Sequence, residues 1–144
     1  MLKDLLQRLF ADNGGVVEVE TLRRGNYAKF ELVEGGAGFV CDKGPVVYLF
    51  YQMDELEHEI RIIASHNHGK VYYGASKSRS GVRLGDDYWF ETTIDGIMAR
   101  RLFNKNDGDP VNGYSTYIAA LLQKVGFATM HHSDGTDSYI RVID

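Results

Sequence analysis

The chain has 144 residues, a formal net charge of −4 and 44% apolar residues, which is typical of one globular domain spanning residues 1–144. Its single cysteine, Cys41, excludes an intramolecular disulfide and a cysteine-rich zinc site. The longest apolar run covers only residues 46–51, too short for a membrane helix, and the N-terminal residues lack a signal-peptide core, so we expect a cytoplasmic protein.

The first half of the chain predicts one helix followed by strands. Leucines and Phe10 recur at helical spacing over residues 2–10, and Asn13-Gly14-Gly15 is typical of a helix end. Period-two alternation and short apolar runs then predict strands over residues 16–19, 26–33, 38–41, 46–51, 56–64 and 71–73. Because the intervening loops are short, these strands should form an antiparallel meander. Its predicted core contains Val47, Leu49, Phe50, Ile60 and Ile62.

The second half predicts a polar loop over residues 75–86, a sixth strand over 88–90, and two helices over 94–103 and 115–125. Thr92 or Thr93 is a suitable N-cap for the first helix, and Ser115 for the second. Asp134-Gly135 lies between two strand-like segments, which is a strong hairpin signal. The predicted fold is therefore α+β: an antiparallel meander sheet of about five to seven strands, packed against an N-terminal helix and two C-terminal helices, and ending in a β-hairpin.

Residues 76–86 are the main candidate for a ligand site. Lys77, Arg79 and Arg83 stand among serines and glycines, whose backbone N–H groups can approach a phosphate. Aromatic residues flank the segment at both ends: Tyr72, Tyr73, Tyr88 and Trp89. Rings beside cations are the ingredients of nucleotide or single-strand binding, where bases stack on the rings. A solvated polar loop has the same composition, and no Walker or Gly-X-Gly-X-X-Gly motif occurs.

Histidines suggest a second kind of site, one that binds a metal ion. His66 and His68 lie two residues apart, and alternate residues of an extended segment share a face. His131, His132 and Asp134 precede a predicted turn and offer further ligands, since imidazole and carboxylate groups bind transition metals. Such a centre would generate a metal-bound hydroxide for hydrolysis. Exposed loop histidines give the same pattern. His58 is expected in the core, on the apolar side of its strand.

The N-terminal segment also permits a winged-helix interpretation, in which residues 27–33 would be the recognition helix. Two observations oppose it. Residues 26–33 fit period two better than the helical period, and residues 1–40 carry five Lys and Arg against six Asp and Glu, a balance that DNA phosphates would not favour.

The functional expectation is a small non-enzymatic binding protein of bacterial or phage type, without a cofactor. The sequence shows no paired nucleophile and base, no four-ligand metal motif and no phosphate loop, and a pI near 5.7 argues against a general nucleic-acid binder. The protein would hold a protein, nucleotide or nucleic-acid partner through an aromatic and basic face. The alternatives are a metal-dependent hydrolase or nuclease that uses the His/Asp cluster, and a winged-helix DNA-binding protein.

Overall fold

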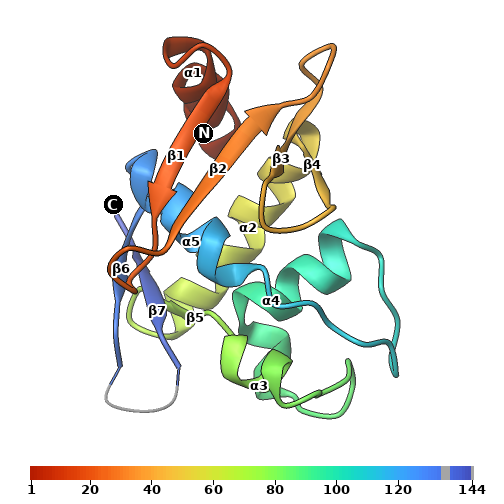
Figure 1. The fold of residues 1–144 in the computed structure, drawn as a ribbon. Coiled ribbons are helices and arrows are strands. Elements are labelled where there is room, and N and C mark those ends of the chain that lie inside the picture. The colour runs from red at the N-terminus through yellow and green to blue at the C-terminus, as the bar shows by residue number, and fades with distance from the viewer. Residues whose placement is uncertain (134–136, 144) are drawn as a thin grey trace.

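The structure is a computed structural model that describes residues 1–133 and 137–143. Over these residues the strands form two antiparallel sheets, with helices between and beside them (Figure 1). The predicted α+β class is confirmed, but the single predicted sheet is replaced by one of four strands and one of three. None of the described helices combines the length and the apolar character that crossing a membrane requires.

The first sheet is a meander in the order β1 (Val16–Glu20), β2 (Tyr27–Leu32), β3 (Gly38–Cys41) and β4 (Val47–Leu49). Alternate residues of β1 and β2 are buried, as their period-two pattern predicts. Since Tyr27–Leu32 is a strand, the recognition helix of the winged-helix alternative does not exist here.

Helix α1 (Leu2–Asp12), predicted from the leucine spacing, packs on this sheet through aromatic rings. The ring centroids lie 5.1 to 6.0 Å apart in a cluster made of Phe10, Phe30, Phe39, Tyr48 and Phe50. This cluster joins the first sheet to the helices on either side of it in the sequence.

The largest correction to the predicted fold concerns helix α2 (Phe50–His66), which replaces the strand expected over residues 56–64 and takes the end of the one expected over 46–51. Alternation is visible only within residues 56–64, whereas the buried side chains recur at helical spacing along the whole element: Phe50, Met53, Leu56, Ile60 and Ala64. The Gln52 side chain supports the helix start by accepting a hydrogen bond from the Leu49 amide at 3.3 Å.

Because residues 50–66 are helical, the buried residues differ in part from the predicted core. Phe50 and Ile60 are buried as predicted, and Leu49 is partly buried. Ile62 is 40% exposed on α2, whereas Val47 is 45% exposed because it lies on β4, the edge strand of the first sheet. His58, expected in the core, is exposed on α2. A helix turns its successive residues through about 100°, so residues that would share one face of a strand diverge around α2.

The second sheet has the order β5 (Lys70–Tyr72), β7 (Tyr139–Val142) and β6 (Ala128–His131). Strands β6 and β7 pair antiparallel, which confirms the predicted terminal hairpin; its turn lies partly outside the described residues. Helix α5 (Ser115–Lys124) forms as predicted and runs with α2 between the two sheets (Figure 1).

Short helices link β5 to α5: α3 (Ala75–Arg79), the 3-10 helix η1 (Trp89–Thr92), α4 (Ile94–Ile97) and the π-helical turn η2 (Met98–Leu102). The predicted helix over 94–103 is thus present, and Thr93 Oγ1 accepts from the Gly96 amide at 3.1 Å as its N-cap. The loop predicted over 75–86 begins as α3. The strand predicted over 88–90 is wrong, because Asp87 Oδ1 accepts from the Trp89 amide at 2.9 Å and starts a helical turn instead.

Candidate functional site

The residues named for the predicted 76–86 site make contacts in several different places. Lys77 Nζ lies 3.3 Å from Asp87 Oδ2 in an ion pair. Arg83 Nη1 donates a hydrogen bond to the Gly108 carbonyl at 2.9 Å. These contacts hold neighbouring loops together, so both cations have a local structural role. The remaining predicted residues divide between two other surfaces.

The first surface carries a row of four rings that includes Tyr72 and Trp89. Ring centroids lie 5.7 Å apart for Trp89 and Tyr72, 5.6 Å for Tyr72 and Tyr139, and 5.1 Å for Tyr139 and His131. The last two rings are stacked, with 14° between their planes. The row therefore runs from η1 across all three strands of the second sheet.

Strand register explains why these rings gather. Tyr72 and His131 both pair with Tyr139. The cations Lys70 and Arg141 pair with each other two residues further along the same strands. Alternate residues of a strand share a face. Val71 and Ile140, which lie between the ring positions and the cation positions, therefore point to the inner face, and both are buried. We call the opposite side of this sheet the aromatic face; it consists of Lys70, Tyr72, Thr129, His131, Tyr139 and Arg141.

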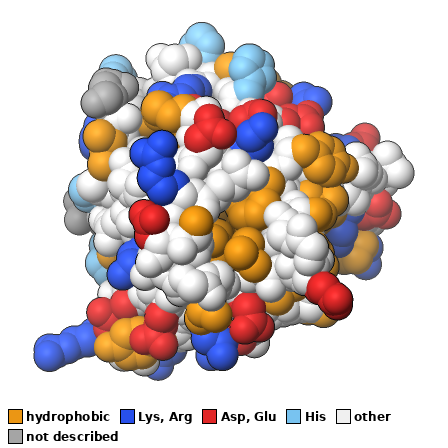
Figure 2. Space-filling view, turned by 90° about the horizontal axis from the view of Figure 1, so that it is seen from above, with side chains coloured by type: hydrophobic (Ala, Val, Ile, Leu, Met, Phe, Trp, Pro, Cys, Tyr) orange, Lys and Arg blue, Asp and Glu red, His pale blue; other side chains and the backbone are white. Residues whose placement is uncertain are grey.

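The aromatic face is positively charged. Lys70 Nζ lies 4.8 Å from the centroid of the Tyr139 ring, a cation–π contact, and Arg141 Nη1 donates to the His68 carbonyl at 2.7 Å. Two cations and no carboxylate stand on this face, although the whole chain carries −4. By contrast, acidic, basic and apolar side chains are interleaved over the end of the molecule that carries α1 and the β2–β3 turn (Figure 2).

Carboxylates do occur next to Trp89, at one end of the ring row. They are neutralised by neighbours: Asp87 pairs with Lys77, and Glu91 Oε1 lies 2.7 Å from Arg100 Nε. Asp86, three residues before Trp89, is exposed and accepts a hydrogen bond from the Arg83 amide at 3.3 Å, so it is the carboxylate of this segment that still opposes the positive charge of the face.

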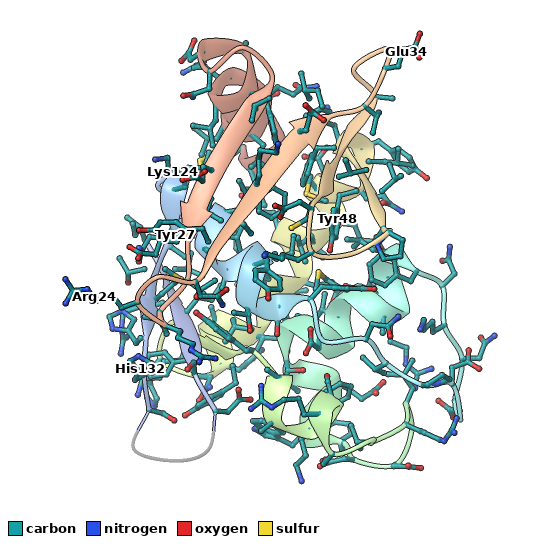
Figure 3. The ribbon with its side chains drawn as sticks, viewed as in Figure 1. Arg24, Tyr27, Glu34, Tyr48, Lys124 and His132 are labelled. Carbon is teal, nitrogen blue, oxygen red and sulfur yellow. The ribbon has the colours of Figure 1, made fainter. Side chains whose placement is uncertain are left out.

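The second surface is a cleft of about 310 Å³, here called the polar cleft. It lies between the β1–β2 turn, the start of α3, the start of α5 and the ends of β6 and β7. Figure 3 shows His132 beside the turn that carries Arg24. The charged and hydroxyl side chains that line the cleft are Thr21, Arg23, Tyr73, Arg79, Thr116, His132, Asp137 and Ser138.

Tyr73, predicted to share a site with Tyr72, belongs to this cleft instead. The Tyr73 side chain is 4% exposed, and its buried hydroxyl has no hydrogen-bond partner among the described residues. Burial, reinforced by the nearby Asp137 carboxylate, raises the pKa of Tyr73 well above its usual range. The hydroxyl therefore stays protonated and available as a donor.

Asp137 has both carboxylate oxygens engaged. Oδ2 accepts from the Gly74 amide at 2.8 Å and Oδ1 from the Ser138 amide at 3.0 Å. Burial raises the pKa of Asp137, against the opposing effect of these bonds and of Arg79. Gly74 has φ +84°, and a Cβ there would lie 2.4 Å from Thr93 Oγ1, so this wall of the cleft requires glycine.

A buried carboxyl that the sequence analysis missed lies between three helices. Asp95 is 1% exposed; its Oδ2 accepts from Ser78 Oγ at 2.8 Å and its Oδ1 from the Ser115 amide at 2.9 Å. Asp95 thus caps α5 in place of the predicted Ser115 side chain. Burial raises the pKa of Asp95 to about 7, although these hydrogen bonds oppose the shift. Its contacts give Asp95 the role of linking α3, α4 and α5.

The histidines proposed as metal ligands are distributed over three places. His66 ends α2 and His68 lies in the turn after it, His131 stacks on Tyr139, and His132 lines the polar cleft. Among the described residues no group of three or more His, Cys, Asp and Glu side chains is arranged to hold a metal ion. Asp134 lies outside the described residues.

No protein-family model, no curated protein and no solved structure matches this chain. Its function is therefore inferred from the aromatic face and the polar cleft themselves.

Proposed function

We propose that this protein is a non-enzymatic binding protein that holds single-stranded nucleic acid on its aromatic face. The observation that carries the proposal is the row of four rings, 5.1 to 5.7 Å between neighbouring centroids, that crosses the second sheet beside two cations. Bases of any sequence stack on aromatic rings, because every base has a π-face, and cations beside the rings attract the phosphates.

The arrangement of the face favours a single strand over the other partners considered. The backbone positions of the rings and of the cations form two parallel rows, about 7 Å apart because they are separated by two residues along each strand, and the Lys70 ammonium reaches back to 4.8 Å from the Tyr139 ring centroid. A single strand likewise exposes bases along one side and phosphates along the other. A duplex keeps its bases paired and stacked internally, so its base faces are not available to these rings.

Local charge supports the same partner. A protein with a net charge of −4 repels nucleic acid on average, and binding then depends on where cations are concentrated. Lys70 and Arg141 are concentrated on the aromatic face without a carboxylate among its six residues. We therefore expect weak binding that depends on salt, with a slope of about −1 to −2 in log K against log salt for two phosphate contacts.

The proposal is tested with a fluorescently labelled 12-nucleotide oligo(dT), whose anisotropy is measured at low salt. Wild-type protein should bind it, and a Tyr139→Leu variant should bind about 5- to 100-fold more weakly, because stacking on one ring contributes about 1–3 kcal/mol. The matched control is Tyr27→Leu, which removes a tyrosine that is 51% exposed on β2, outside the aromatic face.

Three results would contradict the proposal. One is a wild-type protein that does not bind oligo(dT) even at low salt. Another is an equal loss of affinity in Tyr139→Leu and Tyr27→Leu. Binding of an oligo(dT)·oligo(dA) duplex as tightly as the single strand would also refute it, since rings that stack on bases need unpaired ones.

A further inference from the structure

We infer that the polar cleft is a second, separate binding site, which takes a small ligand through a phosphate group. The inference concerns a different part of the molecule from the aromatic face and does not depend on nucleic-acid binding there. Two arginines, Arg23 and Arg79, line the cleft together with His132. Arginine presents a planar fork of N–H donors that matches phosphate oxygens, often in bidentate pairs.

An orphaned hydroxyl gives independent support. Tyr73 lines this cleft, its side chain is almost completely buried, and its hydroxyl has no partner in the part of the chain that the structure describes. Buried polar groups are nearly always hydrogen-bonded, because leaving one unsatisfied is unfavourable. The hydroxyl itself has less than 1 Å² exposed, so a phosphate oxygen in the cleft would accept its hydrogen bond once the side chains that cover it move aside.

The remaining groups of the cleft are compatible with an anion. Asp137 is the only carboxylate among its described lining residues, and both of its oxygens already accept backbone hydrogen bonds, from Gly74 and Ser138. The cations Arg23 and Arg79 outnumber this one acidic group. Thr116 adds a further hydroxyl donor. Together the two arginines, Tyr73 and Thr116 offer more hydrogen-bond donors than the two oxygens of a carboxylate ligand can accept. A phosphate group has more oxygens and can accept more of these hydrogen bonds.

The strands that meet here explain why a site forms at this point. Arg23 lies in the β1–β2 turn of the first sheet, whereas His132 and Asp137 flank the β6–β7 turn of the second (Figures 1 and 3). Arg79 and Tyr73 come from α3 and from the residue after β5. The cleft is therefore built from four separate segments, which is why no local motif in the sequence predicts it.

The test is a titration of the full chain with inorganic phosphate, followed by ¹H–¹⁵N NMR, with sodium acetate and sodium chloride at matched ionic strength as reference anions. Phosphate should shift the backbone amides of residues 73–79 and His132 in a saturable manner, and acetate should do so more weakly. Arg23→Gln should weaken phosphate binding about tenfold, because it removes a charge-assisted hydrogen-bond donor. Arg24→Gln, which alters the neighbouring residue outside the cleft, should leave it unchanged.

Tyr73→Phe separates a binding role from a structural one. The ring and its packing remain, and the lost hydroxyl has no partner in the free protein, so the melting temperature should not fall. Phosphate binding should nevertheless weaken about 5- to 10-fold, as expected for one lost hydrogen bond to a charged group. Both cleft variants should bind oligo(dT) as wild type does, which keeps this test apart from that of the aromatic face.

The inference is overturned if phosphate shifts no amide of the cleft, if Arg23→Gln and Arg24→Gln bind phosphate equally, or if Tyr73→Phe binds it as tightly as wild type. The last result would mean that an ordered water, rather than a ligand, satisfies the Tyr73 hydroxyl.

Discussion

Truncation of Ile60 to alanine is expected to lower the free energy of unfolding by about 2–5 kcal/mol, the range measured when a large buried aliphatic side chain is removed from a core. Ile60 has no exposed surface and lies on the buried side of α2, in contact with the main core. Urea unfolding followed by circular dichroism measures the change.

The matched control is Ile62→Ala, two residues further along. Ile62 is 40% exposed, and alanine is the best helix former, so this variant should change stability by less than about 1 kcal/mol. In a strand, residues 60 and 62 would share one face and both truncations would be costly. Equal, large losses from the two variants would therefore refute the helical assignment of residues 50–66.

Asp95 should make the protein less stable as pH rises from 5 to 8. The folded state raises the pKa of this carboxyl from 3.8 to about 7, so the folded state holds the proton more tightly than the unfolded chain does. The resulting stabilisation is fully present below pH 4 and is lost as pH rises through about 7. Between pH 5 and pH 8 the loss should amount to about 2–3 kcal/mol from this one group.

Asp95→Asn is the variant that isolates the effect. Its amide oxygen can still accept from the Ser115 amide, and the Ser78 hydroxyl can donate to the Gly74 carbonyl, 3.2 Å away. The variant should therefore fold, and its stability should depend less on pH. The pKa of Asp137 is raised in the same direction, and its contribution largely cancels in the comparison because Asp137 is present in both proteins; the part that does not cancel is its charge interaction with Asp95. Equal losses of stability between pH 5 and pH 8 in the two proteins would contradict the assignment.

Local patterns predicted much of the fold. Leucine spacing predicts α1, the valines of residues 16–19 predict β1, alternation predicts β2, and the Asp-Gly signal between two strand-like segments predicts the C-terminal hairpin, because each signal is complete within a short segment. The strand predicted over residues 56–64 is wrong, because aliphatic residues alternate over this short stretch while the buried residues of the whole element follow the helical period. The prediction of one sheet instead of two follows from this error, because α2 separates strands that the prediction places in a single meander.

The candidate sites were predicted only in part, because both depend on tertiary placement. Tyr72 and Trp89 are predicted only at the two ends of the 76–86 segment, and the structure places their ring centroids 5.7 Å apart. Their partner Tyr139 is 67 positions beyond Tyr72 and reaches it only through strand register. The strand pattern of residues 139–142 contained a usable signal: Tyr139 and Arg141 alternate with apolar neighbours, as Lys70 and Tyr72 do. Arg23 and Asp95 offered no comparable signal, since their roles arise from segments distant in the sequence.

The most direct measurement of the central claim uses Trp89, the only tryptophan of the chain, which is 38% exposed at one end of the ring row. Its fluorescence is followed during titration with unlabelled oligo(dT) at low salt. Bases that stack along the aromatic face should quench Trp89 in a saturable manner, with the same dissociation constant as the labelled oligonucleotide gives, and raising the salt should reverse the quenching. If anisotropy detects oligo(dT) binding but Trp89 fluorescence does not change, the nucleic acid binds elsewhere on the protein. That result would contradict binding on the aromatic face.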